Sequence, residues 1–234
     1  MIKFKKILSC ILNPRFYRAY FFGVSPLFEI YPLLSNINKL KTIIDIGSNK
    51  GQFSILAKSY FPQSKIYSFE PQKKYLNIQK KILSKKNIKY FNIGLGNKKN
   101  IKKFYITNRE DSSSFLKPVK KDKDEYKLKS IEKIKIDKLQ NILNTKEIMQ
   151  PSLIKLDVQG FELEALMGSK NILKKIDFII TEMSYQKIYD KQNSNKKLIQ
   201  FLKVNNFEKI KVANITKVNN KLFQSDILFK RINR

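Results

Sequence analysis

Two short segments of the chain carry residues whose types and spacing suit the binding of a small ligand. In residues 42–53, TIIDIGSNKGQF, a short apolar strand with an acid near its end precedes a glycine-bearing turn and a helical pattern. The second segment ends at Phe69-Glu70-Pro71, so that a carboxylate stands 19 residues after the last glycine of the turn. In a strand–turn–helix unit, such an acid lies where a nucleotide-type ribose presents its hydroxyl groups.

The glycine pattern distinguishes two classes of cofactor. A dinucleotide-binding turn has glycine at its first, third and sixth positions, where this chain has Gly47, Asn49 and Gln52. The two missing glycines are those that allow close approach of a pyrophosphate and tight helix–strand packing. The turn therefore favours a ligand without phosphate, and S-adenosylmethionine fits, with Glu70 for its ribose and Asp45 for its ammonium group. A turn that only joins strand to helix is the alternative, and the position of Glu70 argues against it.

The prediction names the residues that would hold this cofactor. They come from the end of the first strand, the turn, the start of the following helix, the acid and the end of the third strand. The predicted cofactor-binding residues are Asp45, Gly47, Ser48, Asn49, Gly51, Phe53, Glu70, Pro71 and Gly94.

Short apolar segments alternate with helical patterns along most of the chain. Strands are predicted at 42–46, 65–69, 88–93, 152–157 and 176–182, and helices at 51–60, 73–84, 137–146, 160–174 and 193–206. This alternation implies a parallel sheet with helices on both faces. Residues 208–213 and 222–230 predict an antiparallel edge pair, and 101–107 and 131–136 two additional strands. The predicted strands 101–107 and 131–136 flank a charged loop, 117–129, which is either a lid over the substrate or a solvated insertion.

The expected fold class is α/β, with a Rossmann-like, seven-stranded, mostly parallel sheet, an antiparallel C-terminal edge pair and an N-terminal helical cap. The cap is assigned to residues 1–38, with helices broken near Pro14 and Pro26, and the main domain to 39–234. The apolar stretch before Cys10 is too short for the core of a signal peptide. We therefore expect a cytoplasmic chain, whose basic N-terminus could also rest on a membrane surface as a peripheral contact.

Composition limits the chemistry that the chain can perform. It has no histidine and one cysteine, which excludes histidine-based triads, Cys–His zinc sites and an internal disulfide. Its formal charge of +29 suggests an anionic partner, yet only five of its 48 basic residues are arginine, the type best suited to phosphate and base contacts. The lysines are scattered instead of forming one dense stripe, so a nucleic-acid partner is not expected.

The motifs resemble those of the FkbM-type family of class I S-adenosylmethionine-dependent methyltransferases. The similar segments follow the order expected for that family and span residues 43–229. They are Ile44–Phe53, Tyr67–Pro71, Ile93–Gly96, Ser112–Phe115, Ile154–Glu164 and Phe178–Glu182. The segment from Asp157 to Glu164 is the most specific of them. The resemblance implies the same Rossmann-like fold and a methyltransferase whose acceptor is a small molecule or glycan.

Catalytic residues are expected where strands end, because ligands of open α/β sheets bind beyond the carboxyl ends of the strands. With no histidine, the general base must be a carboxylate, lysine, tyrosine or metal-bound group. We predict Asp157 and Glu182 as the catalytic residues. Asp157 could instead cap the next helix, and the pair could hold a divalent cation, although no metal site is predicted. Lys155 is expected to pair with a carboxylate, without an assigned role.

The expected function is that of an S-adenosylmethionine-dependent O-methyltransferase acting on a hydroxyl group of a sugar, glycan or related natural product. Two alternatives remain. One is a nucleic-acid methyltransferase that uses the basic surface, and the other is a non-catalytic protein with the cofactor fold that acts as a partner in glycan assembly. The sequence makes no prediction of oligomeric state.

Overall fold

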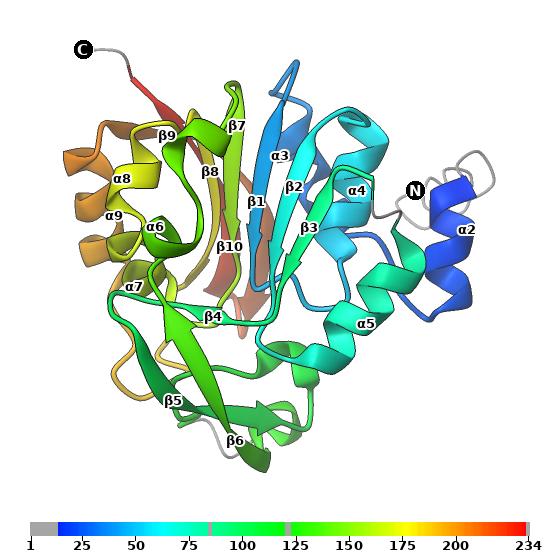
Figure 1. The fold of residues 1–234 in the computed structure, drawn as a ribbon. Coiled ribbons are helices and arrows are strands. Elements are labelled where there is room, and N and C mark those ends of the chain that lie inside the picture. The colour runs from blue at the N-terminus through cyan, green and yellow to red at the C-terminus, as the bar shows by residue number, and fades with distance from the viewer. Residues whose placement is uncertain (1–13, 84–85, 120–122, 233–234) are drawn as a thin grey trace.

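The strand order of the central sheet reverses between β1 (Thr42–Ile46) and β7 (Ser152–Leu156), which creates a crevice at their carboxyl ends. The computed structural model describes residues 14–83, 86–119 and 123–232 (Figure 1). The order of the seven strands is β3 (Ile88–Phe91), β2 (Lys65–Phe69), β1, β7, β8 (Phe178–Ser184), β10 (Lys221–Arg231) and β9 (Phe207–Val218). Ligands of open α/β sheets bind at such a reversal point. The predicted fold class is therefore confirmed, and the crevice lies where the sequence motifs converge.

Five strands pair parallel with one another, and a C-terminal antiparallel pair follows them at one edge, as predicted. The parallel strands are β1 (Thr42–Ile46), β2 (Lys65–Phe69), β3 (Ile88–Phe91), β7 (Ser152–Leu156) and β8 (Phe178–Ser184). The antiparallel pair consists of β9 (Phe207–Val218) and β10 (Lys221–Arg231). Strand β10 lies between β8 and β9 and runs opposite to both, so that β9 has the direction of the parallel strands. The short, largely apolar sequences of β1, β2 and β7 match their burial within a sheet that is covered on both faces.

Helices cover both faces of the sheet (Figure 1). One face packs against α2 (Pro14–Phe21), α3 (Tyr31–Leu34), α4 (Gln52–Tyr60) and α5 (Lys73–Ile82), and the other against α6 (Leu139–Ile142), α7 (Glu162–Met167), α8 (Lys170–Leu173) and α9 (Asn195–Val204). Strand β1 shows the division, because Ile43 belongs to the first core and its neighbour Ile44 to the second.

Two helical predictions need correction, and the N-terminal ones are tested only in part. The predicted helix 160–174 is divided into α7 and α8 at Gly168, where a Cβ would lie 2.0 Å from the carbonyl oxygen of Gly96. The predicted helix 137–146 is reduced to α6. Residues 1–13 lie outside the described part of the chain, and so does the proposed membrane-facing N-terminus. None of the helices in the described part is long and apolar enough to cross a membrane.

A second, smaller sheet lies below the central one in the view of Figure 1. It consists of β4 (Gly94–Leu95), β6 (Leu128–Asp137) and β5 (Asn100–Thr107), in the order β4-β6-β5. The predicted strand 88–93 therefore ends early, and Gly94 begins a strand of this second sheet. A Cβ at Gly94 would lie 2.3 Å from the ring of Phe115, so packing explains the glycine there.

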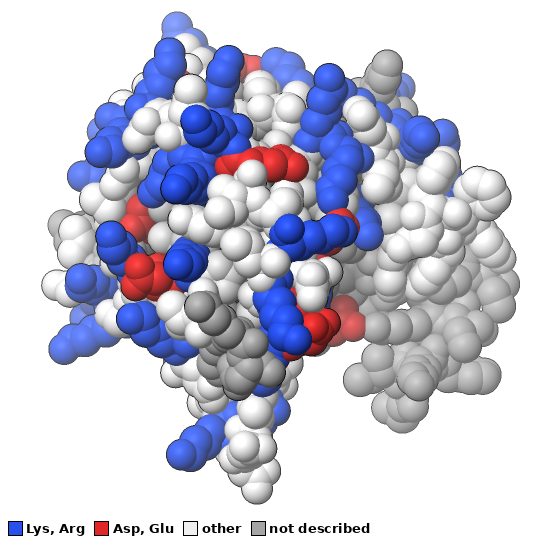
Figure 2. Space-filling view, turned by 90° about the horizontal axis from the view of Figure 1, so that it is seen from below, with Lys and Arg blue, Asp and Glu red and all other residues white. Residues whose placement is uncertain are grey.

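The surface seen from below carries many lysines and arginines between scattered acidic residues (Figure 2).

The predicted loop 117–129 has residues 120–122 outside the described part. Its remaining residues include Tyr126, which is buried and packs in a cluster with Ile188, Tyr189 and Phe223. This part of the loop is therefore anchored to the protein by apolar contacts.

The turn after β1 is held between the ends of β2 and β7. The N–H groups of Gly47 and Ser48 both donate hydrogen bonds to the carbonyl oxygen of Phe69, at 3.0 and 3.1 Å. Gly47 has a φ of 75°, and a Cβ there would lie 2.0 Å from the carbonyl oxygen of Asp157. Glycine is thus required at this position both for the backbone conformation and for the approach to β7.

We expect Gly47→Ala to destabilise the protein more than Gly23→Ala. Both glycines have positive φ, 75° and 67°, so both substitutions strain the backbone. Among the residues that the structure describes, no atom apart from those of its chain neighbours lies within 4 Å of a Cβ at Gly23, whereas the Cβ at Gly47 would collide with the carbonyl oxygen of Asp157 after β7. The collision should lower the free energy of unfolding by a further 1–3 kcal/mol, approximately, in urea titrations. Equal losses in the two variants would contradict this account of the turn.

Candidate active site

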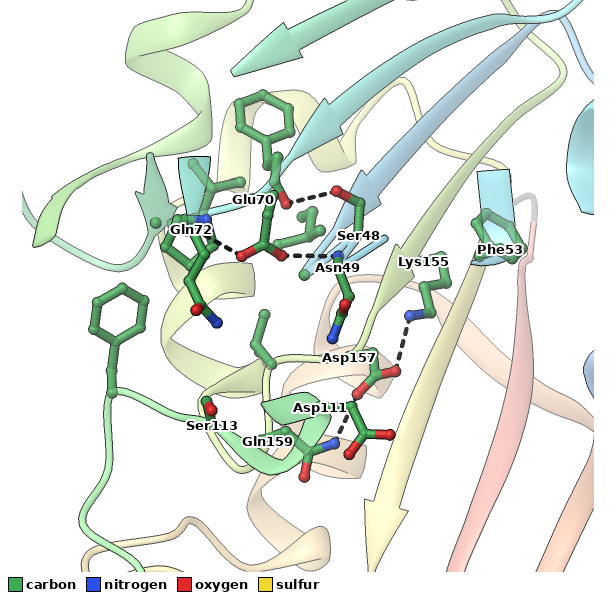
Figure 3. A pocket seen from close by; sticks show the side chains of 18 of the residues that line it. Ser48, Asn49, Phe53, Glu70, Gln72, Asp111, Ser113, Lys155, Asp157 and Gln159 are labelled. Atoms are coloured by element: carbon green, nitrogen blue, oxygen red, sulfur yellow. Dashed lines mark hydrogen bonds and ion pairs between the residues drawn. The ribbon is translucent and has the colours of Figure 1, made fainter. Parts of the chain in front are cut away.

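A cleft of about 870 Å³, partly open to solvent, lies at the carboxyl ends of β1, β2 and β7. The turn and the end of β2 form one side, and the small sheet and the segment after β7 form the other (Figure 3). The lining includes these residues from the predicted site: Gly47, Ser48, Asn49, Phe53, Glu70, Pro71, Gly94 and Asp157. Three further predicted site residues, Asp45, Gly51 and Glu182, do not line it.

Glu70 connects the end of β2 to the turn after β1. Its Oε2 accepts a hydrogen bond from the backbone N–H of Asn49, and its Oε1 accepts one from that of Gln72, both at 2.8 Å. The side chain is buried, and burial raises the pKa of the Glu70 carboxyl to about 7. The carboxylate therefore lies at the wall of the cleft and keeps lone pairs that could accept further hydrogen bonds.

Two buried amide oxygens in the same wall lack a partner. Within the described residues, Asn49 Oδ1 and Gln72 Oε1 are inaccessible to solvent and accept no hydrogen bond. An unsatisfied buried acceptor is costly, and a ligand with hydroxyl or amino donors would satisfy it. Together with Glu70, these atoms form a wall that suits a donor-rich ligand. A phosphate group would not fit this wall, because at neutral pH it presents hydrogen-bond acceptors to a surface that itself consists of acceptors.

Asp45 and Gly51 support the cleft from behind. Asp45 is fully buried and accepts a 2.7 Å hydrogen bond from the hydroxyl of Ser54 in α4. Burial raises the pKa of Asp45, and this is opposed by the charge of Lys155, directly opposite on β7. Gly51 has a φ of 88° and precedes α4 as its N-cap. Direct cofactor contact by these two residues stays a prediction.

Lys155 lines the cleft, and the sequence assigned no role to it. Its side chain is only 5% exposed, and its Nζ lies 3.0 Å from Oδ2 of Asp157, whose side chain is 34% exposed. Burial opposes the charged form of Lys155, but Asp157 and Asp45 outweigh it, and the pKa lies above its usual value. A lysine two residues before an acid, within an apolar strand, was the available signal. That Lys155 lies opposite Asp45 could be known only from the pairing of β1 with β7 in the sheet.

Gln159 joins the two predicted catalytic carboxylates. Its Nε2 donates to Oδ1 of Asp157 at 2.8 Å and to Oε2 of Glu182 at 3.1 Å. Its Oε1 accepts a hydrogen bond from the hydroxyl of Tyr189. Burial raises the pKa of Glu182 well above its usual value, and the nearby Asp157 and Asp226 add to this. The structure thus brings Asp157 and Glu182 together, because the side-chain amide of Gln159 binds both carboxyl groups. Asp157 lines the cleft, whereas Glu182 does not.

The loop after β7 is closed by Glu162, and the alternative role of Asp157 as a helix cap is not seen. Oε1 of Glu162 accepts hydrogen bonds from the N–H groups of Val158 and Gly160, at 3.3 and 3.1 Å. Helix α7 begins at Glu162 with Phe161 as its N-cap, and no side chain caps it by a hydrogen bond. In the described residues, no group of three or more acidic or cysteine side chains is arranged to hold a metal ion.

Comparison with known proteins follows the same residues. The sequence profile of the methyltransferase FkbM domain matches residues 45–209, from the end of β1 into β9. An rRNA methylase from Streptococcus thermophilus has a similar structure, with a TM-score of 0.51 and 10% identity over 89% of this chain and 97% of that one. A putative S-adenosylmethionine-dependent methyltransferase from Listeria monocytogenes is also similar in structure. Its TM-score is 0.50 and its sequence identity 10%, over 88% of this chain and 98% of that one. No curated protein matches significantly.

We expect Lys155→Met to lower the free energy of unfolding by about 3–5 kcal/mol, because it leaves the fully buried carboxylate of Asp45 without the positive charge that lies opposite it. The control is Lys89→Met, which breaks the pair of Lys89 with Glu147 at 2.9 Å, where the lysine side chain is 53% exposed. An exposed pair contributes about 0–1 kcal/mol. Urea titration at pH 8 measures both losses, and similar small losses would show that the Lys155 pair is not needed for stability.

Proposed function

The chain belongs to the family of methyltransferases with an FkbM domain, and on this premise we propose that it transfers a methyl group from S-adenosylmethionine to a hydroxyl group of a sugar, glycan or related natural product. The observation that carries the proposal is the cleft in which Glu70, the Gly47 turn and Asp157 meet at the reversal point of the sheet. The cleft joins a wall of hydrogen-bond acceptors, which would hold the cofactor, to the carboxylate of Asp157, which would act on the acceptor hydroxyl.

The wall of the cleft supports S-adenosylmethionine as the cofactor. Glu70 would accept hydrogen bonds from the ribose hydroxyls, and the unpartnered oxygens of Asn49 and Gln72 would accept them from amino or hydroxyl groups of the adenosyl moiety. When bound, S-adenosylmethionine supplies a methyl group activated by a positively charged sulfur. The protein has to hold and align the reactants, and positioning alone can contribute about 7–11 kcal/mol.

Asp157 would act as the general base. It lies on the cleft, is partly accessible, and its Oδ2 is paired with Lys155. In this position the carboxylate could accept the proton of an acceptor hydroxyl. The raised pKa of Glu182 favours its protonated form, which reduces repulsion with Asp157. Gln159 orients both groups through its amide.

The acceptor side of the cleft supports a neutral, hydroxyl-rich substrate. Asp111, Ser113 and Gln159 line it, and Figure 3 shows Asp111 and Gln159 beside Asp157. Carboxylate, hydroxyl and amide groups can donate to or accept from the hydroxyls of a sugar. Among the described residues that line the cleft, Lys155 is the only basic one, and it already forms an ion pair with Asp157. A phosphate backbone would therefore find little compensation there, which favours a glycan over a nucleic acid.

We expect S-adenosylhomocysteine to bind about tenfold more weakly at pH 6 than at pH 8. The pKa of Glu70 in the free protein is about 7. Hydroxyl donors favour its ionised form, so affinity is full above this pH and falls as the carboxylate becomes protonated below it. Isothermal titration calorimetry of the wild type at both pH values measures the difference, and Glu70→Gln should bind weakly and without this pH dependence.

Glu132→Gln, at an exposed position of β6, is the matched control for this measurement and should keep both the affinity and its pH dependence. An affinity of Glu70→Gln equal to that of the wild type would contradict the assignment of Glu70. Wild-type protein that does not bind S-adenosylhomocysteine at either pH would contradict the proposed cofactor.

We expect Asp157→Asn to reduce turnover by about 10²- to 10⁴-fold, the usual contribution of a general base, and to leave S-adenosylhomocysteine affinity unchanged. Asp190→Asn, at an exposed position, should retain full turnover. Transfer of tritiated methyl groups to a panel of sugars, nucleotide sugars and glycans measures the rates, with RNA as a competing class of acceptor. If RNA were the only acceptor methylated, the acceptor would be a nucleic acid and not a sugar or glycan. Full activity of the Asp157→Asn variant would exclude Asp157 as the general base.

A further inference from the structure

The small sheet has two faces of opposite character, and only one of them contributes to the proposed active site. Strands β5 and β6 pair antiparallel, so residues directly opposite one another share a face. On the inner face, Phe104, Ile106 and Ile134 are each at most 8% exposed, and Phe104 lines the cleft. The outer face is built from the intervening residues of both strands, and the chemistry proposed above does not use it.

Three successive cross-strand pairs form this outer face, here called the basic sheet face. They are Ile101 opposite Lys135, Lys103 opposite Lys133, and Tyr105 opposite Ile131. The isoleucines are 59% and 48% exposed, and the three lysines are exposed as well. In the described part of the chain, none of these lysines forms an ion pair. The acid of the same strand, Glu132, is paired with Phe104 and therefore belongs to the other face.

This arrangement does not stabilise the free protein. Like charges directly opposite one another in an antiparallel pair are destabilising, and Lys103 and Lys133 stand in that relation. The exposed isoleucines flank the lysines and gain nothing from contact with water. A partner that is both anionic and partly apolar would relieve the repulsion and bury the isoleucines in one contact.

We propose that the basic sheet face binds the surface of a membrane that contains anionic lipid. Lysines near such a surface are attracted to its negative potential, and apolar side chains can enter the boundary between headgroups and acyl chains. The sheet presents both kinds of side chain on one face. Figure 2 shows that basic side chains are widespread on the side of the molecule seen from below. The distinguishing feature of the basic sheet face is the alternation of its lysines with exposed isoleucines.

RNA is a weaker match for this face. Proteins that bind single-stranded RNA on a sheet stack the bases on aromatic side chains, and arginine is the preferred contact for phosphate and bases. The basic sheet face has no arginine, and its one aromatic residue, Tyr105, is partly buried. Exposed isoleucines match the apolar layer of a bilayer but have no counterpart in a phosphate backbone.

Co-sedimentation of the full chain with lipid vesicles tests the proposal without cofactor or acceptor, so its result is independent of the proposed methyl transfer. The vesicles contain phosphatidylcholine alone, or phosphatidylcholine with one third phosphatidylglycerol. The test variant carries Lys103→Gln, Lys133→Gln and Lys135→Gln. The matched control carries Lys196→Gln, Lys197→Gln and Lys203→Gln, at exposed positions of α9, and loses the same net charge. All proteins keep the same N-terminal segment, so its contribution is common to every arm.

The wild type should bind the anionic vesicles and not the neutral ones. The test variant should bind at least about tenfold more weakly than the wild type, since each lysine near an anionic surface is attracted to it, and the control should bind within about threefold of the wild type. Ile101→Ser with Ile131→Ser should also weaken binding, with little change in its salt dependence.

Circular dichroism and thermal unfolding establish that the variants are folded. Three results would overturn the proposal. They are equal losses for the test variant and the control, the absence of wild-type binding to anionic vesicles, and a test variant that keeps vesicle binding while losing affinity for single-stranded RNA.

Discussion

The hydrogen bond from the backbone N–H of Asn49 to the carboxylate of Glu70, at 2.8 Å, is the contact on which the site depends. It joins the turn after β1 to the end of β2, while Gly47 brings the same turn against the carbonyl of Asp157 after β7. Three strand ends are thereby fixed relative to one another by a single turn. Because the strand order reverses here, the groups meet around a cleft that helices do not fill.

The second constraint is the balance of charge beneath the cleft. Lys155 lies opposite Asp45 across the strand pair and bonds to Asp157, within a region where burial raises the pKa of Glu70, Glu162, Glu182 and Asp226. One buried cation thus serves two carboxylates that the sequence places more than a hundred residues apart. Buried charges of this kind cost stability, and active sites are where proteins commonly retain them.

Local pattern was sufficient to predict the strands of the central sheet, the glycine turn and the acid at position 70, because each depends on neighbouring residues. It failed where distant segments decide the outcome. The pairing of Gly94 with Ile136 turns a supposed strand end into the start of a second sheet, and the approach of Gly96 to Gly168 divides a helix that its sequence predicts to be continuous. The role of Lys155 was missed for the same reason, since its partner Asp45 becomes visible only through the register of β1 and β7.

The most direct test of the account is a crystal structure of the protein with S-adenosylhomocysteine. The account predicts the adenosyl group in the cleft, with both ribose hydroxyls within hydrogen-bonding distance of the Glu70 carboxylate and the homocysteine moiety extending past the Gly47 turn towards Asp157. A ligand whose ribose lies away from Glu70, or one that occupies a different surface of the protein, would contradict it.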